Sequence, residues 1–571
     1  MADLLQDFKD LEEEQNDLRS RMDTDKDLVE HKTYEMTDWA NKAVKKAINV
    51  TLNKPGVFAW NVESALNNAT EQVNIETEDK KIDKDHIADF VRAAFDSDNS
   101  YANMQGKWPL NPFIDQQMCR RGRGGLLVVS KLMEIKDASG KAKKVLRVII
   151  RRDDSRYSAW DTGAQGLSLY GYRSTRSKKD ILADYPDLET KLGTKKSAQV
   201  VDIWTPEQNA VYVDDALTLE QPNPFGFVPA CGQIVTLGAM TADDDANKFY
   251  GESIFFLIRN IIPEKNRLIS IMQTLNTIGI KPPKEWQSQN AEQDAPQYDD
   301  VMAAGSITPS EVGGGIKDIN FGDLKNSAIY SLNIIDNALN EGSMDVVNVG
   351  DIPAGGLSAV ALIQIGEGQD QVFLPRLGAR GLLKQQAANM VIRQVKALGE
   401  SRVELGPMGR ERTFDVKKLE GAYDIEYKYF VKSPKIDLAR YSMAQVAQSI
   451  GIPQEDIDRD ILQLEDPQGT QRRRSREKAA ALSPLIEAMN IIKDLSETGD
   501  DDDKLKAEIL AEQFNMDLDR TLAGETPAMA AAEKPKAQPG QLMPLLNDLE
   551  RPNSAKEAAQ LQGTPRGGNN G

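Results

Sequence analysis

The stretch YGESIFFLIRNIIP, residues 250–263, contains an unbroken apolar run, residues 254–258, in a chain that is otherwise hydrophilic. A helix that spans a bilayer needs about 20 predominantly apolar residues. Arg259, Asn260 and Pro263 interrupt this stretch well short of that length. The stretch therefore predicts a helix whose apolar face is covered by protein, and the question is which protein surface covers it.

The helix that this stretch begins is predicted to cover residues 250–278. Apolar residues recur along it at spacings that place them on one helix face. Pro263 removes a backbone donor, which predicts a bend, and Gly279 followed by Pro282 predicts the end. The residues on its apolar face include Ile254, Phe255, Ile258, Ile261, Leu268 and Met272.

A second helix is predicted over residues 323–346, after a segment rich in proline and glycine, residues 279–322. Asp323 is placed to cap this helix. Its apolar stripe, at spacings typical of one helix face, includes Leu324, Leu332 and Ile335. The two helices are therefore expected to form an antiparallel pair with a small projecting tip, which leaves them exposed in a single subunit.

A glycine-rich loop, residues 347–358, follows the pair and precedes a long helix predicted from residue 359 to about 398. The loop contains GDIPAGG but lacks the lysine that ends a nucleotide-binding loop, so a mobile loop is the favoured interpretation. The helix is interrupted by residues that commonly cause kinks, namely Gly366, Pro375 and Gly378. Residues 359–435 comprise this helix and a strand that returns to the body.

The region before the quoted stretch, residues 32–249, is predicted to be helical at first and rich in strands from Gly124 onward. The runs GLLVVSKLMEI and VLRVIIRR flank the turn-forming DASGKAKK and predict a β-hairpin. VVDIWTPEQNAVYV, residues 200–213, predicts another, with Pro206 and Asn209 in its turn. These elements predict an α+β fold class that is mainly helical.

The two ends of the chain differ from its middle. Residues 1–31 predict a charged helical arm with Leu5 and Phe8 on its apolar face. This arm docks on a neighbour or stays on its own subunit, and both interpretations are open. Residues 436–520 contain further helices, and residues 521–571, rich in Ala, Pro, Gly and Gln, are predicted to be disordered.

Two arginine clusters are candidates for contact with DNA or another anion. They contribute Arg120, Arg121 and Arg123 from CRRGRGG, and Arg472, Arg473 and Arg474 from RRRSR. CRRGRGG lacks the Lys-Ser/Thr ending of a phosphate loop and the glycine spacing of a dinucleotide site. The alternative for both clusters is a solvated or salt-bridged surface.

Composition limits the function further. The net charge is −18, and affinity for a phosphate backbone comes from Lys and Arg displacing counterions, so contact with DNA should be loose or local. Cys119 and Cys231 give no disulfide framework, which favours assembly inside a cell. His31 and His86 leave no zinc spacing and no hydrolase triad. We predict no metal, no cofactor, no catalytic residue and no enzymatic activity, and the N-terminus has no signal peptide.

The order of these parts resembles that of portal proteins, the head-to-tail connectors of tailed bacteriophages. In that family an α/β wing leads through a proline-rich connector into a stem helix that starts at Gly-Glu-Ser. The connector PNPFGFVP and the motif Tyr250-Gly251-Glu252-Ser253 carry the match, which covers most of residues 100–400. The resemblance implies a wing over residues 32–249, stem helices over 250–278 and 323–346, a clip over 279–322, a tunnel loop over 347–358, a kinked helix over 359–435 and a helical crown over 436–520.

The resemblance also implies a ring, dodecameric in the family, through which double-stranded DNA is packaged and ejected at one capsid vertex. Neighbouring copies would cover the apolar faces of the stem helices. The residues expected to touch DNA are those of the tunnel loop, Gly350, Asp351, Ile352, Pro353, Ala354, Gly355, Gly356 and Leu357.

The implied partners are a terminase motor, adaptor or tail proteins at the clip and the major capsid protein at the wing. The implied location is the virion, after assembly in the host cytoplasm and without a membrane. Two alternatives stay open: another virion structural or scaffold protein, and a nucleotide-dependent DNA-processing enzyme. The second would need a phosphate loop ending in Lys-Ser/Thr, and the sequence has none.

Overall fold

The computed structural model describes residues 4–44, 47–136, 142–164, 166–236, 251–280, 284–287, 315–318, 324–343, 359–430 and 434–482, and a few positions between 488 and 511. The chain divides into two compact units, Met1–Gln471 and Arg472–Gly571. The predicted tunnel loop, residues 347–358, and the predicted disordered tail, residues 521–571, lie outside the described residues.

A five-stranded antiparallel sheet is built from strands that follow one another in the chain. Its members are β4 (Ser158–Gly163), β5 (Gly166–Ser177), β6 (Ser197–Trp204), β7 (Gln208–Val213) and β8 (Ala216–Pro222). β6 and β7 are the hairpin predicted from residues 200–213. The short helices α6 (Lys178–Asp184) and α7 (Glu189–Leu192) lie in the connection between β5 and β6.

The N-terminal arm packs on this sheet of its own subunit. It consists of α1 (Leu4–Glu14) and α2 (Asn16–Val29). Leu5 and Phe8 are buried against strand residues that include Ala159 and Ile203. A side chain at Gly171 of β5 would overlap the Phe8 ring, so the absence of a side chain there lets Phe8 pack on the sheet. Of the two open interpretations, these apolar residues agree with the one in which the arm stays on its own subunit.

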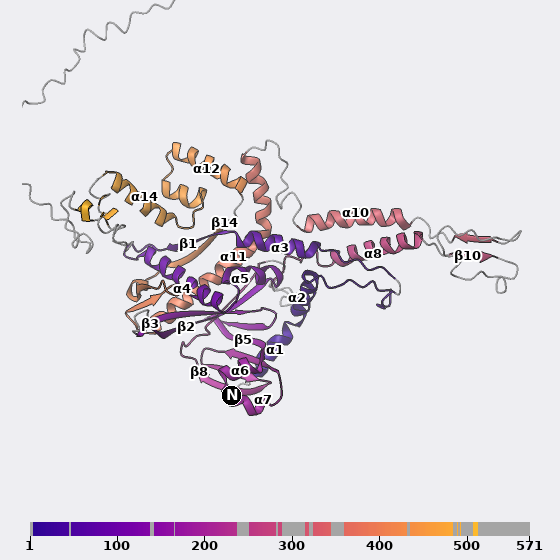
Figure 1. The fold of residues 1–571 in the computed structure, drawn as a ribbon, viewed down its shortest axis with the longest axis horizontal. Coiled ribbons are helices and arrows are strands. Elements are labelled where there is room, and N and C mark those ends of the chain that lie inside the picture. The colour runs from indigo at the N-terminus through magenta and orange to yellow at the C-terminus, as the bar shows by residue number, and fades with distance from the viewer. Residues whose placement is uncertain are drawn as a thin grey trace, which may run out of the picture. The chain divides into compact units, whose positions relative to one another are not determined.

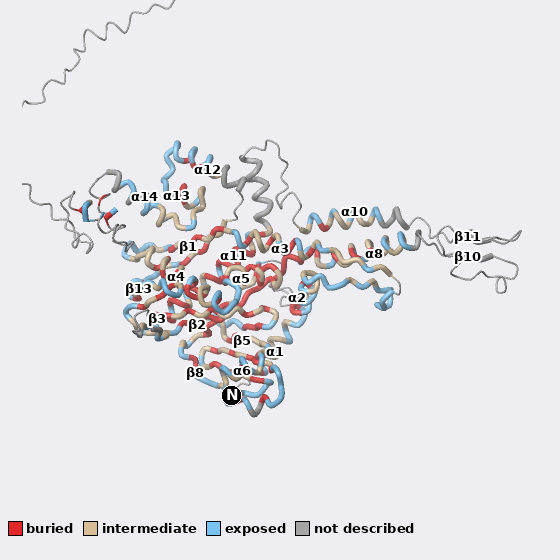
Figure 2. Tube along the Cα trace, in the orientation of Figure 1, coloured by how far each residue is buried: buried red, intermediate tan, exposed pale blue. Residues whose placement is uncertain are grey.

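A second, three-stranded sheet has the order β3–β2–β9. The predicted hairpin is present as β2 (Arg123–Lys136) and β3 (Ala142–Asp153), and β9 (Ala230–Ile234) pairs antiparallel with the start of β2. The core of this part joins sheet residues such as Val128 to Phe90 and Leu383 on helices. Figure 2 shows buried residues concentrated around β2, α5 and α11.

The helices and strands that complete this body come from distant parts of the chain. They are α3 (Lys54–Asn67), β1 (Thr70–Glu76), α4 (Lys84–Met104), α5 (Leu110–Arg120), α11 (Ala359–Ala397), β12 (Arg402–Leu405), β13 (Arg412–Asp415) and β14 (Asp424–Phe430). β14 pairs antiparallel with β1, which confirms the strand that was predicted to follow the long helix and return to the body. Beyond them follow α12 (Pro434–Ser449), α13 (Gln454–Asp456) and α14 (Pro467–Leu482).

The predicted pair of helices is present as α8 (Ile261–Ile280) and α10 (Leu324–Gly342), which lie side by side (Figure 1). At their far end β10 (Lys284–Gln287) pairs antiparallel with β11 (Gly315–Asp318). We call α8 and α10 the stem. The end next to residues 254–258 is its base, and the end next to β10 is its distal end.

The start of α8 differs from the prediction. Residues 254–260 form successive turns, and the helix begins only at Ile261. Pro263 therefore lies in the first turn of α8 and does not interrupt a longer helix. The first backbone N–H groups of a helix have no intrahelical partner, so a proline costs little there.

Residues 32–44 and 47–52 are the second difference, because they were predicted to be helical and contain no helix. The N–H groups of Ile48, Val50 and Leu52 donate to side chains of α8 and not to carbonyls of their own segment. Helical periodicity in a short polar stretch did not reveal these long-range partners.

Candidate functional site: the stem and its base

Two glycines make the close contact through which the chain enters the stem. Gly251 has φ +86° and Gly122 has φ +71°, both in the left-handed region that favours glycine. A Cβ at Gly122 would lie 2.5 Å from the carbonyl carbon of Glu252, and a Cβ at Gly251 would overlap the carbonyl oxygen of Gly122. The glycines of CRRGRGG and of YGES therefore meet, which neither motif alone predicted.

A buried polar cluster joins helix α2 to the residues after Gly251. Ser253 Oγ donates to Asp25 Oδ2 at 2.6 Å, and Arg259 Nε donates to Asp25 Oδ1 at 2.7 Å. Arg259 Nη2 also donates to Glu252 Oε2 at 3.0 Å, and Arg21 donates to the other carboxylate oxygen of Glu252. Two carboxylates and two guanidinium groups thus fix the base of the stem to the N-terminal arm.

The electrostatics of this cluster favour the charged form of Arg259. Burial lowers the pKa of Arg259, but the hydrogen bond and charge of Asp25, followed by those of Glu252, outweigh burial and raise the pKa above its ordinary value. Arg21 differs, because burial lowers its pKa more than Glu252 raises it. A buried charge left without its partner is costly, so the cluster constrains the direction in which the stem leaves the body.

The apolar run of the quoted stretch is covered mainly by its own subunit. Ile254, Phe255 and Ile258 are buried in a cluster with Phe58 and Phe373, and the Phe58 and Phe255 rings meet edge to face at 6.2 Å. The prediction that neighbouring copies cover these three residues is wrong. The reason is that residues 254–260 fold as turns, which lets the run enter the body.

The remaining predicted interface residues lie on the stem itself. Those with described side chains are half-buried, namely Ile261, Leu268, Met272, Leu332 and Ile335. The side chain of Leu324 lies outside the described part. Lys265 of α8 forms an ion pair with Asp336 of α10, and a Cβ at Gly342 would lie 2.8 Å from the Ile258 side chain. The apolar side chains that these helices leave most exposed are different ones, Ile329, Tyr330 and Ile334 of α10.

An extended segment, residues 47–52, runs along α8, and we call it the strap. The N–H groups of Leu52, Val50 and Ile48 donate to Asn266 Oδ1, Ser270 Oγ and Thr274 Oγ1 at 3.2, 2.9 and 3.0 Å. Four helical residues rise about 6 Å, and two extended residues rise about 6.6 Å. The two spacings match, so alternate strap amides meet successive turns of α8.

Helix α11 carries a row of buried charges that the sequence patterns did not reveal. Arg380 Nη1 donates to both carboxylate oxygens of Asp115 at 2.9 and 2.7 Å, and Lys384 Nζ donates to those of Glu71 at 2.6 and 2.7 Å. Burial raises the pKa of Glu71, but the charge and hydrogen bond of Lys384 outweigh it and hold the pKa below its ordinary value. Arg380 and Lys384 lie four residues apart, which places them on one face of a helix. This spacing was the signal in the sequence that could have revealed the row.

The first predicted arginine cluster has structural partners. Arg120 donates to both oxygens of Glu63 at 2.7 and 2.9 Å. Arg121 pairs with Asp154 and donates to the carbonyl of Met22. Arg123 is buried and its guanidinium lies 3.7 Å from the centroid of the Trp160 ring. The prediction of contact with DNA is therefore wrong for Arg123, which is buried. Arg120 and Arg121 fit the alternative, because both form salt bridges.

The second cluster lies on α14. Arg473 is exposed and Arg474 is half-buried, while the side chain of Arg472 lies outside the described part. Contact of these residues with DNA stays a prediction.

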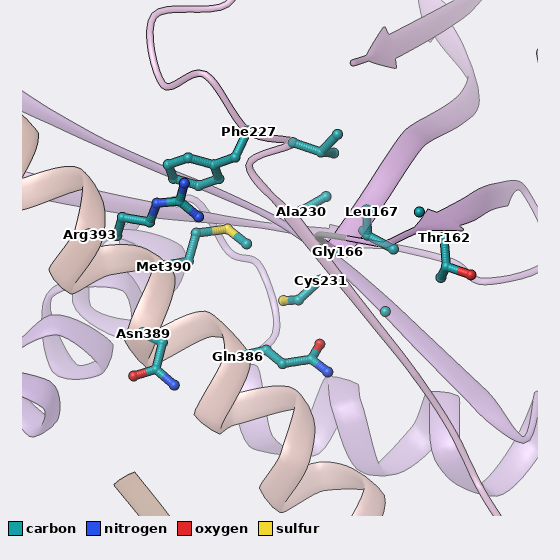
Figure 3. Close-up of a pocket in the computed structure, with 13 residues that line it drawn as sticks. Thr162, Gly166, Leu167, Phe227, Ala230, Cys231, Gln386, Asn389, Met390 and Arg393 are labelled. Carbon is teal, nitrogen blue, oxygen red and sulfur yellow. The ribbon is translucent and has the colours of Figure 1, made fainter. Parts of the chain in front are cut away.

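A pocket of about 550 Å³ lies between α11 and the residues around β9. In Figure 3, Gln386, Asn389, Met390 and Arg393 come from one face of α11. The Arg393 guanidinium lies 3.9 Å from the centroid of the Phe227 ring. The lining brings together apolar groups, amides and one guanidinium, and no nucleophile paired with a base.

The described residues offer no metal-binding group of His, Cys, Asp and Glu side chains. Cys119 and Cys231 are buried free thiols, and burial raises the pKa of Cys231 to about 12. The His86 ring lies 3.0 Å from the carbonyl oxygen of Asp415, which gives it a structural partner. In the part of the chain that is described, every helix is too short or too polar to cross a bilayer.

Comparison with known proteins gave matches among solved structures only, since no family model and no curated protein matches the chain. A chain in the neck of an empty GTA particle, computed with C6 symmetry, is 13% identical, with a TM-score of 0.34 over 72% of this chain and 90% of that one. A chain in the neck of a native GTA particle, computed with C12 symmetry, is 12% identical, with a TM-score of 0.32 over 72% and 89%. A chain in the virion of a native gene transfer agent particle is 13% identical, with a TM-score of 0.31 over 72% of this chain and 89% of that one. Likenesses at TM-scores this low establish neither the fold nor the function of this chain.

Proposed function

We propose that this chain is a portal protein, one of the subunits of a ring at a capsid vertex through which double-stranded DNA is packaged and ejected. The observation that carries the proposal is the stem. Two antiparallel helices leave an α/β body at Gly251-Glu252-Ser253, end in a two-stranded tip, and are followed by the long helix α11. This order is the one that the resemblance to portal proteins implies.

The exposure of the stem supports a ring. α10 exposes Ile329, Tyr330 and Ile334, although a single subunit gains nothing from solvated apolar side chains. A head-to-tail interface that closes into a ring would cover such a face in every copy at once. The dodecameric state is part of this proposal.

The charge of the chain suits a channel. A net charge of −18 disfavours the counterion release that makes proteins adhere to DNA. DNA would therefore slide past the subunits, guided by the loop Gly350–Leu357 through shape and not through chemistry. We propose no enzymatic activity and no cofactor, with a terminase motor, adaptor or tail proteins at residues 279–322 and the major capsid protein at residues 32–249 as partners in the virion.

The proposal is tested by deleting Ala354–Gly356 in cells that produce the particle. Rings are expected to form as in the wild type, while packaged or retained DNA falls by at least about tenfold, because the deletion leaves the stem and body unchanged. A matched control deletes Gly568–Asn570 from the C-terminal end. Loss of the rings themselves, or normal packaging, would contradict the assigned role of the loop.

A further inference from the structure

A tip, residues 37–43, precedes the strap in the chain and is built around Asp38. The Asp38 carboxylate accepts from the N–H groups of Ala40 and Lys42 at 2.8 and 2.9 Å, and its own N–H donates to the Lys42 carbonyl at 2.8 Å. Asn41 takes the left-handed conformation with φ +58°, and Thr37 bridges to Ala43. The loop is therefore organised before it meets any partner.

This organised tip presents Trp39 with 98% of its surface exposed. Tryptophan is among the residues that contribute most to protein interfaces, and a preorganised loop lowers the entropy lost on binding. The strap that supports the tip is fixed to α8 by three hydrogen bonds. A solvated indole on an organised loop is the feature expected of an anchor that inserts into a partner.

The strap and α10 lie against different sides of α8. A helix turns by 100° per residue, so Lys265, which pairs with Asp336 of α10, lies about 100° from Asn266 and about 180° from Thr274 around the helix. Figure 1 agrees, since α8 lies between α10 and the indigo segment that contains the strap. The stem thus has a strap edge and an α10 edge.

The α10 edge exposes apolar side chains. Tyr330 is 70% exposed and Ile334 is 53% exposed, and they lie four residues apart on one face. Asp336 and Leu339, which face α8 and the body, lie on the other side of α10. One edge of the stem therefore carries an apolar anchor, and the opposite edge carries an apolar face.

The two features lie at a similar height along the stem. The Lys265–Asp336 pair sets the antiparallel register, so Tyr330 lies level with about residue 271 of α8. The strap amides pair with Ser270 and Thr274 at that level, and the tip lies beside the distal half of α8 in Figure 1. A rotation about an axis along the stem keeps this height, which brings the strap edge of one copy to the α10 edge of the next.

We propose that Trp39 of one copy docks on the face formed by Tyr330 and Ile334 of the adjacent copy. The contact is head-to-tail, because its two surfaces lie on opposite edges of the same stem, and such a contact can close into a ring. The occupant of the α10 face is thus a second copy of this chain. This inference rests on the proposed ring and names the residues that hold it together.

The test is a cross-link between Trp39→Cys and Tyr330→Cys placed in one full-length chain. A short bis-maleimide should then join neighbours into a ladder that ends at the full ring on a denaturing gel. The native Cys119 and Cys231 are buried with raised pKa values, so they should not react. The matched control combines Tyr330→Cys with Trp108→Cys, an exposed position on the body, and should give no ladder.

The second measurement uses Trp39→Ala and mass photometry. The concentration at which rings dissociate should rise by about tenfold or more, as for an interface hot spot, while the melting temperature of the subunit stays unchanged because Trp39 is solvated. Wild-type rings without a ladder, together with unchanged Trp39→Ala rings, would overturn this contact and leave the proposed function standing. A wild-type chain that forms no ring would overturn the proposed function itself.

Discussion

Single residues at the base of the stem explain why YGESIFFLIRNIIP combines an apolar run with charged side chains. The apolar run enters the body, where Phe255 meets Phe58. The interruption that excludes a membrane span, Arg259, is the cation that holds Asp25 and Glu252. Arg259 and the apolar run therefore both attach the base of the stem to the body.

The first prediction concerns this junction. Arg259→Ala leaves the buried Asp25 without its main cation, and removing one partner of a buried pair typically costs about 3–5 kcal/mol. The midpoint of chemical denaturation should fall accordingly. Arg267→Ala is the matched control, because Arg267 pairs with Glu264 on the same helix with both side chains about half exposed, which contributes at most about 1 kcal/mol. Equal effects of the two variants would contradict this account of the junction.

The second prediction uses Glu71, whose pKa is lowered in the folded state by Lys384. A lowered pKa means that the stabilisation is complete above the ordinary pKa of the glutamate and is lost as the pH falls through the lowered value. Glu71→Gln should therefore be less stable than the wild type at pH 7. The difference should shrink below about pH 4, since protonated Glu71 resembles Gln. Denaturation curves across this pH range test the prediction, and a difference that does not depend on pH would contradict it.

At the scale of elements, the strap depends on side chains of α8 and not on a β-sheet. Asn266, Ser270 and Thr274 accept from the strap, and the two hydroxyl groups also donate to carbonyls of α8 itself. A hydroxyl that accepts and donates at once lets a helix bind an extended chain. The strap positions the tip that carries Trp39.

The third prediction follows from these hydrogen bonds. Ser270→Ala removes the acceptor for the Val50 N–H, so hydrogen exchange of the strap amides should become at least about tenfold faster, which corresponds to about 1.4 kcal/mol. Thr277→Ala is the control, because the Thr277 hydroxyl is exposed and bonds only within α8. Unchanged exchange in the Ser270 variant would show that the strap is held by other contacts.

The sequence predicted those elements whose signals are local. Apolar runs rich in β-branched residues, with turn-forming residues between them, predicted β2, β3, β6 and β7, and apolar stripes predicted the helical pair. It failed where contacts with distant residues determine the structure. Examples are residues 47–52, of which three amides pair with side chains of α8, and residues 254–260, which form turns against the body. The arginines of CRRGRGG illustrate the same limit, because their carboxylate partners lie in other elements.

At the scale of the whole molecule, one chain is the repeating unit of the proposed ring. The body buries its own core, including Ile254, Phe255 and Ile258, which were first expected at an interface. The stem leaves Trp39 on one edge and Tyr330 on the other, both solvated. A closed ring of copies would remove both from water, and the acidic chain would line a passage to which DNA adheres weakly.

The most direct measurement is electron microscopy of the purified full-length protein in negative stain. Class averages should show a ring with a central hole and twelvefold symmetry. A monomer, or a featureless dimer that persists at high protein concentration, would contradict the portal assignment.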